Sequence, residues 1–158
     1  MPEAAALSPE EWDVWRAFVA MRRQLDLTLE HQLQRDGDIS AADYGILISL
    51  FESPEKQLRA GELSQELAWE KSRVSHQVSR MEKRGLVERR LCDTDARGTW
   101  VGMTPAGSRA VLGAMRGHAD ALRQHFFDAL STEEIAAISS ASQHVLDTLE
   151  PIDCSSVE

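Results

Sequence analysis

The sequence predicts a mainly helical, single-domain protein with one small β-hairpin, and three observations support this. The chain has 158 residues, 42% of them hydrophobic, which is enough for one sizeable core. Apolar residues recur at helical spacing in several segments separated by turn and cap residues. The spacing changes to strand-like alternation only between residues 86 and 103.

The composition excludes several classes of protein. With 5 prolines, 9 glycines and 27% charged residues, the chain is neither disordered nor collagen-like. Its two cysteines, Cys92 and Cys154, are too few for a disulfide framework, so a cytoplasmic location is expected. No apolar stretch is long enough to span a membrane. The first eleven residues are acidic and do not resemble a signal peptide.

Helix-start patterns define the N-terminal third of the chain. Ser8 is the expected N-cap of the first helix, with Glu11 at the capping-box position, and the apolar pattern continues until Gly37. A helix of about 28 residues, or ~42 Å, is long for one small domain. Ser40 is the expected N-cap of a second helix, which continues to Phe51 before a Ser-Pro pair.

The central third predicts two short helices followed by a hairpin. Residues 60–68 and 72–84 are the expected helices, and Gly85 closes the second one. That second helix is apolar on one face and polar and basic on the other, which is typical of a helix-turn-helix. A hairpin over residues 86–103 follows directly, so the layout is that of a winged helix. Two further helices are expected over residues 104–130 and 131–149.

The charge is distributed unevenly. The whole chain carries 17 basic and 26 acidic residues, a net charge of −9, which argues against a nucleic-acid partner. Residues 69–97 hold eight basic and five acidic residues, a local +3, so the remainder carries −12. This basic segment predicts either a localised surface for phosphate or a solvated helix and hairpin that are rich in Lys and Arg.

Two motifs give the chain a specific resemblance. The stretch Asp95-Ala96-Arg97-Gly98-Thr99-Trp100-Val101-Gly102-Met103-Thr104-Pro105-Ala106-Gly107 resembles the MarR-family wing signature D-x-R-x-x-x-V-x-L-T-x-x-G, with Met103 at the usual Leu position. The stretch Arg80–Arg89 is similar to the R-L-E-x-x-G-L-V-x-R run that ends the family's recognition helix. Residues 69–77 are similar to an actinobacterial branch. The resemblance covers roughly Ser8 to Leu149.

The resemblance implies a single MarR-type domain over residues 1–158. Its expected fold is a winged helix-turn-helix, with dimerisation helices at 8–36 and 104–149 and a DNA-binding lobe at 40–103. Within that lobe the helix-turn-helix covers about 60–84 and the wing about 86–103. Family members are usually repressors that bind a palindromic operator as homodimers. A twofold dimer would place two recognition helices ~34–36 Å apart, in successive major grooves.

The candidate DNA-binding residues follow from the second helix of the motif and from the wing. Arg73, His76 and Gln77 can pair with base edges, although Gln77 lies toward the buried face. Phosphate contacts are expected from Lys71, Ser72, Ser75, Arg80, Arg89 and Arg90. Arg97 resembles the wing arginine that enters the minor groove, with Asp95 orienting it.

A ligand site is a further expectation from the resemblance. Many family members are released from DNA by small phenolic or aromatic acids, and Trp15, Tyr44 and His118 could line such a pocket or belong to the core. Oxidation of Cys92 could disturb the wing, but a small hairpin residue is the simpler interpretation. The histidines lack the spacing of a metal site, so neither a metal nor another cofactor is predicted.

Two classes of function remain open from the sequence. The first is a dimeric transcription regulator responsive to a ligand. The second is a winged-helix sensor or interaction protein that does not act through sequence-specific DNA binding. The acidic remainder of the chain favours it slightly, and the intact basic face of the recognition helix disfavours it. No catalytic motif such as G-x-S-x-G, a P-loop or H-E-x-x-H is present, so an enzyme is not expected.

Overall fold

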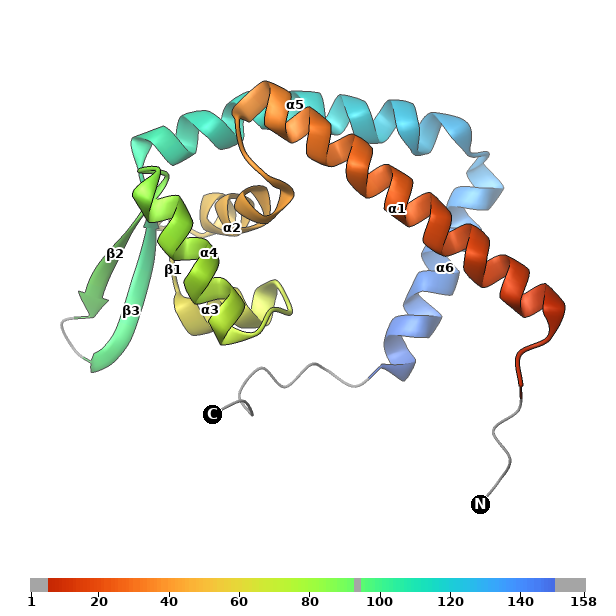
Figure 1. Ribbon diagram of the computed structural model, residues 1–158, viewed down its shortest axis with the longest axis horizontal. Helices are drawn as coiled ribbons and strands as arrows, with labels where there is room; N and C mark the ends of the chain where they lie inside the picture. The colour runs from red at the N-terminus through yellow and green to blue at the C-terminus, as the bar shows by residue number, and fades with distance from the viewer. Residues whose placement is uncertain (1–5, 93–94, 150–158) are drawn as a thin grey trace, which may run out of the picture.

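The computed structural model describes residues 6–92 and 95–149, and for residues 91, 92 and 95–98 it describes the backbone alone. Within these limits the fold is mostly helical with a small sheet (Figure 1). The elements in chain order are α1 (Pro9–Gly37), α2 (Ala41–Glu52), β1 (Gln57–Arg59), α3 (Ala60–Glu66), α4 (Lys71–Lys83), β2 (Val87–Cys92), β3 (Asp95–Met103), α5 (Pro105–His125), the 3₁₀ turn η1 (Phe127–Ala129) and α6 (Thr132–Thr148).

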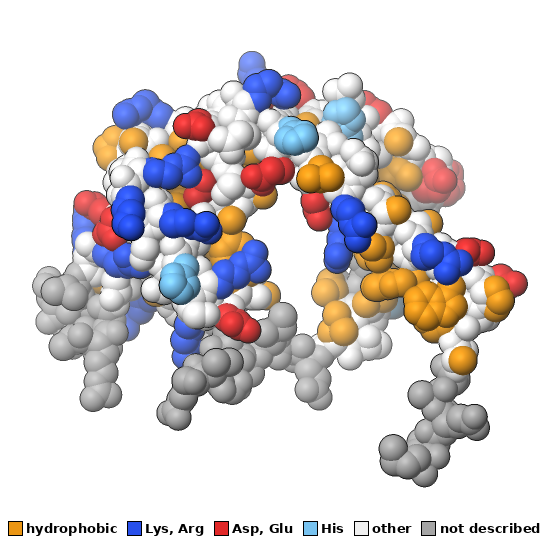
Figure 2. Space-filling model, in the orientation of Figure 1, with side chains coloured by type: hydrophobic (Ala, Val, Ile, Leu, Met, Phe, Trp, Pro, Cys, Tyr) orange, Lys and Arg blue, Asp and Glu red, His pale blue; other side chains and the backbone are white. Residues whose placement is uncertain are grey.

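The long helices α1 and α5 form the top of an arch (Figure 1). They pack against each other along the C-terminal part of α1. At one end of the arch, α2, α3, α4 and the sheet form a compact body, and at the other end α6 passes behind the middle of α1 in this view and descends below the arch. Figure 2 shows that the space below the arch stays open when all side chains are drawn.

Apart from Leu33 of α1, the core lies in the compact body and the first half of α5, which together we call the core lobe (residues 39–114). Its fully buried side chains come from α2, α3, α4, the sheet and the first half of α5, with Leu33 of α1 closing one side. The buried hydrophobic residues are Leu33, Ile39, Ile46, Leu47, Leu50, Leu63, Val74, Val78, Met81, Leu86, Val87, Val101, Val111 and Ala114. Their periodicity is the one that predicted helices in the sequence, so the core explains the pattern.

Local sequence signals determine where the helices begin. The predicted capping box of Ser8 with Glu11 forms, and the predicted N-cap Ser40 forms a capping box with Asp43. Gly85 follows α4 with φ of 71°, a left-handed conformation that glycine adopts without a steric penalty. The expected helix over residues 104–130 is shorter than predicted, because α5 ends at His125 and η1 follows.

The sheet contains a strand that the sequence analysis missed. β1 pairs antiparallel with β3, which also pairs with β2, so the order is β1-β3-β2. A strand of three residues is too short to show alternation, and only its pairing with residues 100–102 of β3 defines it. The predicted hairpin is therefore two strands of a three-stranded sheet.

A glycine of the wing motif allows α5 to pack closely on this sheet. A Cβ atom at Gly107 would lie 2.2 Å from the carbonyl oxygen of Leu86 and 3.1 Å from a methyl group of Leu47. No larger residue fits without moving backbone. The T-x-x-G part of the motif thus has a structural reason, since Thr104 caps α5 by accepting a hydrogen bond from the Gly107 N–H.

The N-terminal two thirds of α1 and all of α6 lie outside the core. The only buried residues of α1 are Gln32 and Leu33, and α6 has none. Large apolar side chains of these two helices are instead exposed: Trp12, Val14, Trp15, Phe18, Met21, Leu27, Ile138, Val145 and Leu146. Among the described residues, no helix is long and apolar enough to cross a membrane.

Candidate nucleic-acid interface

Helix α4 has one apolar face and one polar, basic face. Val74, Val78 and Met81 are buried in the core lobe. The opposite face is exposed and carries the predicted contact residues Lys71, Ser72, Arg73, Ser75 and His76. Figure 2 shows Lys and Arg side chains gathered over α4 and its neighbours in the core lobe. The fold therefore offers the polar, basic face of this helix to solvent while the apolar face anchors it.

The first turn of α4 differs in one respect from the sequence analysis. The helix begins at Lys71, one residue before the expected start, with Glu70 as the N-cap and no side-chain capping bond, so Ser72 lies inside the first turn. The preceding turn is held by Ser64, whose hydroxyl donates to the Trp69 carbonyl and whose own carbonyl accepts from the Trp69 N–H. This turn fixes the angle between α3 and α4.

Trp69 also holds the side chain of Arg73. The guanidinium carbon lies 4.0 Å from the centroid of the indole ring, which is a cation–π arrangement. Trp69 is itself half-buried and packs against the core. Stacking reduces the number of rotamers that Arg73 samples, so the exposed arginine is partly preorganised. This pair was not predicted from the sequence, although the spacing of four residues between Trp69 and Arg73 is a signal that could have indicated it.

The strand β2 is joined to α4 by Arg89. Its guanidinium donates to Glu82 at 2.7 Å and to the Ser75 carbonyl and the Ser79 hydroxyl at 2.9 Å each. Arg89 therefore fastens the wing to the recognition helix as well as lying in the basic segment. Arg90 is more exposed and pairs with Glu88 on the same strand. Exposed pairs of this kind contribute only ~0–1 kcal/mol and break readily.

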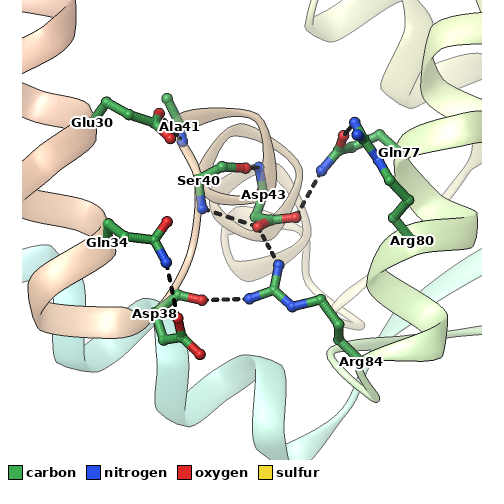
Figure 3. Close-up of polar contacts among 9 residues, drawn as sticks. All are labelled: Glu30, Gln34, Asp38, Ser40, Ala41, Asp43, Gln77, Arg80 and Arg84. Atoms are coloured by element: carbon green, nitrogen blue, oxygen red, sulfur yellow. Dashed lines mark hydrogen bonds and ion pairs between the residues drawn. The ribbon is translucent and has the colours of Figure 1, made fainter.

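Gln77 requires a correction. Its side chain is only 4% exposed, and its amide donates to the carboxylate of Asp43 at 2.7 Å. Its amide oxygen accepts from Arg80. Figure 3 shows these groups facing the start of α2. They line a cavity of about 550 Å³ between α1, α2 and α4. A buried and fully engaged amide does not reach a base, so Gln77 is removed from the predicted base contacts.

Asp43 was not among the predicted site residues, and Arg84 was counted only within the basic segment, residues 69–97. The structure pairs them, with Arg84 Nη1 2.6 Å from Asp43 Oδ2. Burial acts to raise the pKa of Asp43, but the backbone hydrogen bond from Ser40 and the bonds from Arg84 outweigh it and hold the pKa below the usual range. The 41 residues between the partners left no sequence signal for the pair.

Two of the three predicted ligand-site residues come together. The Tyr44 and His118 rings lie 4.6 Å apart, centroid to centroid. Gln32 donates from its amide nitrogen to Asp36 and to the Ala114 carbonyl, so its amide oxygen accepts from His118 Nδ1 at 3.1 Å. Burial lowers the pKa of His118 and raises that of Tyr44, so both are neutral at pH 7.

Trp15 is separated from this pair within one chain. It stacks on Phe18, with ring centroids 5.9 Å apart, near the start of α1. Seventeen residues separate it from Gln32, or ~25 Å along the helix axis. Trp15 therefore does not line a site with Tyr44 and His118 of the same chain.

Some predicted residues cannot be placed. The side chains of Cys92, Asp95 and Arg97, and residue Cys154 as a whole, lie outside the described part of the structure. Within the described part, no group of three or more His, Cys, Asp or Glu side chains is arranged to hold a metal ion.

The fold and the site together define a class of protein. A helix-turn-helix followed by a β-wing, with a basic outer face on its second helix, is the architecture of winged-helix nucleic-acid-binding proteins. Comparison with known proteins then identifies the family. A family model described as the MarR family matches residues 38–98. No curated protein sequence matches the chain.

Solved structures match over nearly the whole chain. Sco3205, a MarR family transcriptional regulator from Streptomyces coelicolor crystallised in complex with DNA, is 36% identical, with a TM-score of 0.89 over 96% of this chain and 94% of that one. AbsC, a MarR family transcriptional regulator from the same organism, is 32% identical, with a TM-score of 0.81 over 92% and 100%. The transcriptional regulator PcaV, also from S. coelicolor and in complex with its natural ligand, shares the fold at 19% identity and a TM-score of 0.73 over 92% and 99%.

The chain therefore belongs to the MarR family, whose members are transcriptional regulators and not enzymes. The predicted winged helix-turn-helix fold is confirmed.

Proposed function

We propose that this protein is a homodimeric, cytoplasmic repressor that binds a palindromic DNA operator through α4 and the wing. The observation that carries the proposal is the exposed basic face of α4, on a lobe that a 36% identical regulator crystallised with DNA shares. A net charge of −9 does not oppose this, because screening confines the attraction to charges within ~8 Å of a phosphate.

The proposed contacts differ in what they contribute. Arg73 and His76 read base edges in the major groove, and the stacking of Arg73 on Trp69 keeps its guanidinium extended along the helix surface. Lys71, Ser72, Ser75 and Arg80 bind phosphates, so they add affinity without sequence preference. Arg97, oriented by Asp95, enters the minor groove. Arg89 and Arg90 lie beside the phosphate backbone of the DNA.

The proposed dimer is supported by the exposed apolar side chains of α6 and of one face of α1, the face that carries Val14, Trp15, Phe18 and Met21; Leu27 points away from that face. A monomer rarely exposes so many large apolar side chains on two of its helices. The open arch in Figure 2 gives a second copy space to cover them. In this proposal, residues 8–36 and 104–149 form the dimer and residues 40–103 the DNA-binding lobe, within one domain over residues 1–158.

We further propose that a small aromatic acid releases the protein from DNA by binding beside Tyr44 and His118. The two rings offer an aromatic wall, and the imidazole and phenol offer hydrogen bonds. They lie where α2 of the core lobe meets the crossing of α1 and α5, so a ligand there would change the angle between lobe and dimer helices. PcaV, which shares this fold, was crystallised with its natural ligand.

The proposed function is tested by selecting DNA from a random library with the purified protein. Fluorescence anisotropy on the selected sequence at two salt concentrations should give an affinity of about 10⁻⁸ M or tighter and a steep salt dependence. Enrichment of a palindrome confirms the regulator. Weak binding with no sequence preference, with and without a panel of aromatic acids, contradicts it and favours the sensor or interaction protein.

A further inference from the structure

One carboxylate at the start of α2 is turned toward the recognition helix. The Asp43 side chain is only 2% exposed. One of its oxygens, Oδ2, accepts from the Ser40 backbone N–H at 2.9 Å, which completes the capping box of α2. A cap needs no more than that bond, and exposed caps elsewhere in the chain have none of the additional partners of Asp43.

The additional partners are Gln77 of α4 and Arg84, the C-cap residue of that helix. Gln77 Nε2 donates to Asp43 Oδ1 at 2.7 Å, and Arg84 Nη1 donates to Asp43 Oδ2 at 2.6 Å. Gln77 and Arg84 are seven residues apart, so they lie on the same face of the helix and ~10 Å apart along its axis. Two bonds at this separation fix both the rotation of α4 about its axis and its position along it.

The same cluster reaches the end of the long helix α1. Asp38 caps that end in a left-handed conformation, and its carbonyl accepts from Arg84 Nη2. Arg84 therefore joins the C-terminus of α4 to the junction between α1 and α2, as Figure 3 shows. Gln77 in turn accepts from Arg80. The amide of Gln77 thus has one orientation, with its nitrogen toward Asp43 and its oxygen toward Arg80.

This cluster sets the geometry of the face that reads DNA. Arg73 and His76 project from the α4 turn next to Gln77, and a hydrogen bond to a base edge weakens steeply when its angle or length departs from the optimum. A helix held only by Val74, Val78 and Met81 could rotate slightly, because apolar contacts are not directional. The bonds to Asp43 are directional and charge-assisted, so they oppose that rotation.

We propose that Asp43 is a positioning residue for operator recognition, which holds α4 through Gln77 and Arg84 in the orientation that matches the major groove. This inference rests on the proposed function, since it concerns how the same interface reads sequence. In this proposal Arg84 bonds to groups of the protein itself and not to DNA, although it belongs to the basic segment and its side chain is 43% exposed. The competing assignment is a phosphate contact by Arg84.

The first arm of the test needs no DNA. Hydrogen exchange of the α4 amides is measured in the full-length protein and in Asp43→Asn, Arg84→Gln and Arg35→Gln. Arg35→Gln is the matched control, because Arg35 pairs with Asp36 on the surface and lies outside the cluster. Exchange in α4 should be about tenfold faster in the first two variants and unchanged in the control. Unchanged exchange in all three overturns the proposal.

The second arm measures affinity for the selected palindrome and for a scrambled duplex of the same length. Asp43→Asn and Arg84→Gln should each lower the ratio of the two affinities about tenfold or more, with the scrambled affinity and the salt slope unchanged. The double variant should lose less than the sum of the two single variants, because both changes break the bond between Asp43 and Arg84. An equal loss on both duplexes, with a salt slope smaller by about one, overturns the proposal and makes Arg84 a phosphate contact.

The two measurements distinguish a failure of this inference from a failure of the proposed function. If the natural protein selects no palindrome, the proposed function fails, and the exchange data alone decide whether Asp43 holds α4. If Asp43→Asn does not fold, Arg84→Gln removes the same bond from the more exposed partner and carries both arms.

Discussion

The core lobe and the terminal helices differ in how they are stabilised. In the core lobe, fourteen buried hydrophobic residues from five helices and the sheet form one cluster, counting Leu33 of α1. In α6 no residue is buried, and along the N-terminal two thirds of α1 none is buried and most of the large apolar side chains are exposed. Both regions have the same helical periodicity of apolar residues, yet only one of them has a core within the chain.

An apolar stripe on a helix therefore predicts that the stripe is buried, but it does not predict which surface covers it. Within the core lobe the covering surface is supplied by neighbouring elements of the same chain. For α1 and α6 the open arch offers none (Figure 2), which is why we propose a second copy. If the two regions differ in this way, substitutions in them should have different effects on dimerisation and on stability.

A charge on the exposed apolar face of α1 should abolish the dimer. Phe18→Glu would place an unpaired carboxylate in the proposed interface, which costs about 3–5 kcal/mol and weakens dimerisation on the order of 10²–10³-fold. Operator affinity should fall with it. Sedimentation equilibrium and anisotropy measure the two quantities.

Leu27→Glu is the control for this change. Leu27 is as exposed as Phe18, at 49% against 47%, but nine residues away, so it points in the opposite direction from the same helix. It should leave the dimer intact. Equal loss of dimer in both variants would mean that the face of α1 does not matter and that the interface is elsewhere.

The same leucine deletion should act differently in the two regions. Leu47→Ala removes a fully buried side chain of the core lobe and should lower the free energy of unfolding by about 2–5 kcal/mol at every protein concentration. Leu146→Ala, on α6, should instead make the melting temperature more dependent on protein concentration. Calorimetry over a hundredfold range of concentration compares them. A concentration-independent loss in Leu146→Ala would argue for burial within the chain.

Loss of the stacked arginine should relax base preference. Arg73→Ala removes the guanidinium that lies over Trp69 and should cost about 1–3 kcal/mol of discrimination at one base pair of each half-site. Repeating the DNA selection with the variant measures it. A uniform loss of affinity across all sequences would reassign Arg73 to a phosphate contact.

The smallest effect is a pH dependence from His118. Burial lowers its pKa in the folded protein, so below pH ~6.5 the unfolded chain takes up a proton that the folded chain resists. Stability should therefore be full at pH 7 and decline as the pH falls from about 6.5 toward 5. His118→Gln should show a flatter decline in thermal unfolding than the natural protein. Identical slopes would exclude His118 as the cause.

The elements of the fold were predictable from the sequence where the signal is local. The caps at Ser8 and Ser40 and the left-handed Gly85 involve residues within one turn of each other, so their patterns appear directly in the chain. β1 was missed because three residues show no periodicity, and its identity depends on a partner more than forty residues away. The end of α5 at His125 was misjudged because η1 continues the apolar spacing.

In the candidate site, too, local features were predictable from the sequence and contacts between distant segments were not. That α4 has a buried face and a basic face was determined by the sequence alone, because a period of 3.6 residues assigns each side chain to a direction. Which polar residues on that helix face inward was decided only by the tertiary structure. Gln77 lies between the two faces, and the carboxylate of Asp43, distant in the chain, draws it inward with Arg84. Directional bonds between charged and polar groups depend on where remote segments meet, and no pattern within one segment records that.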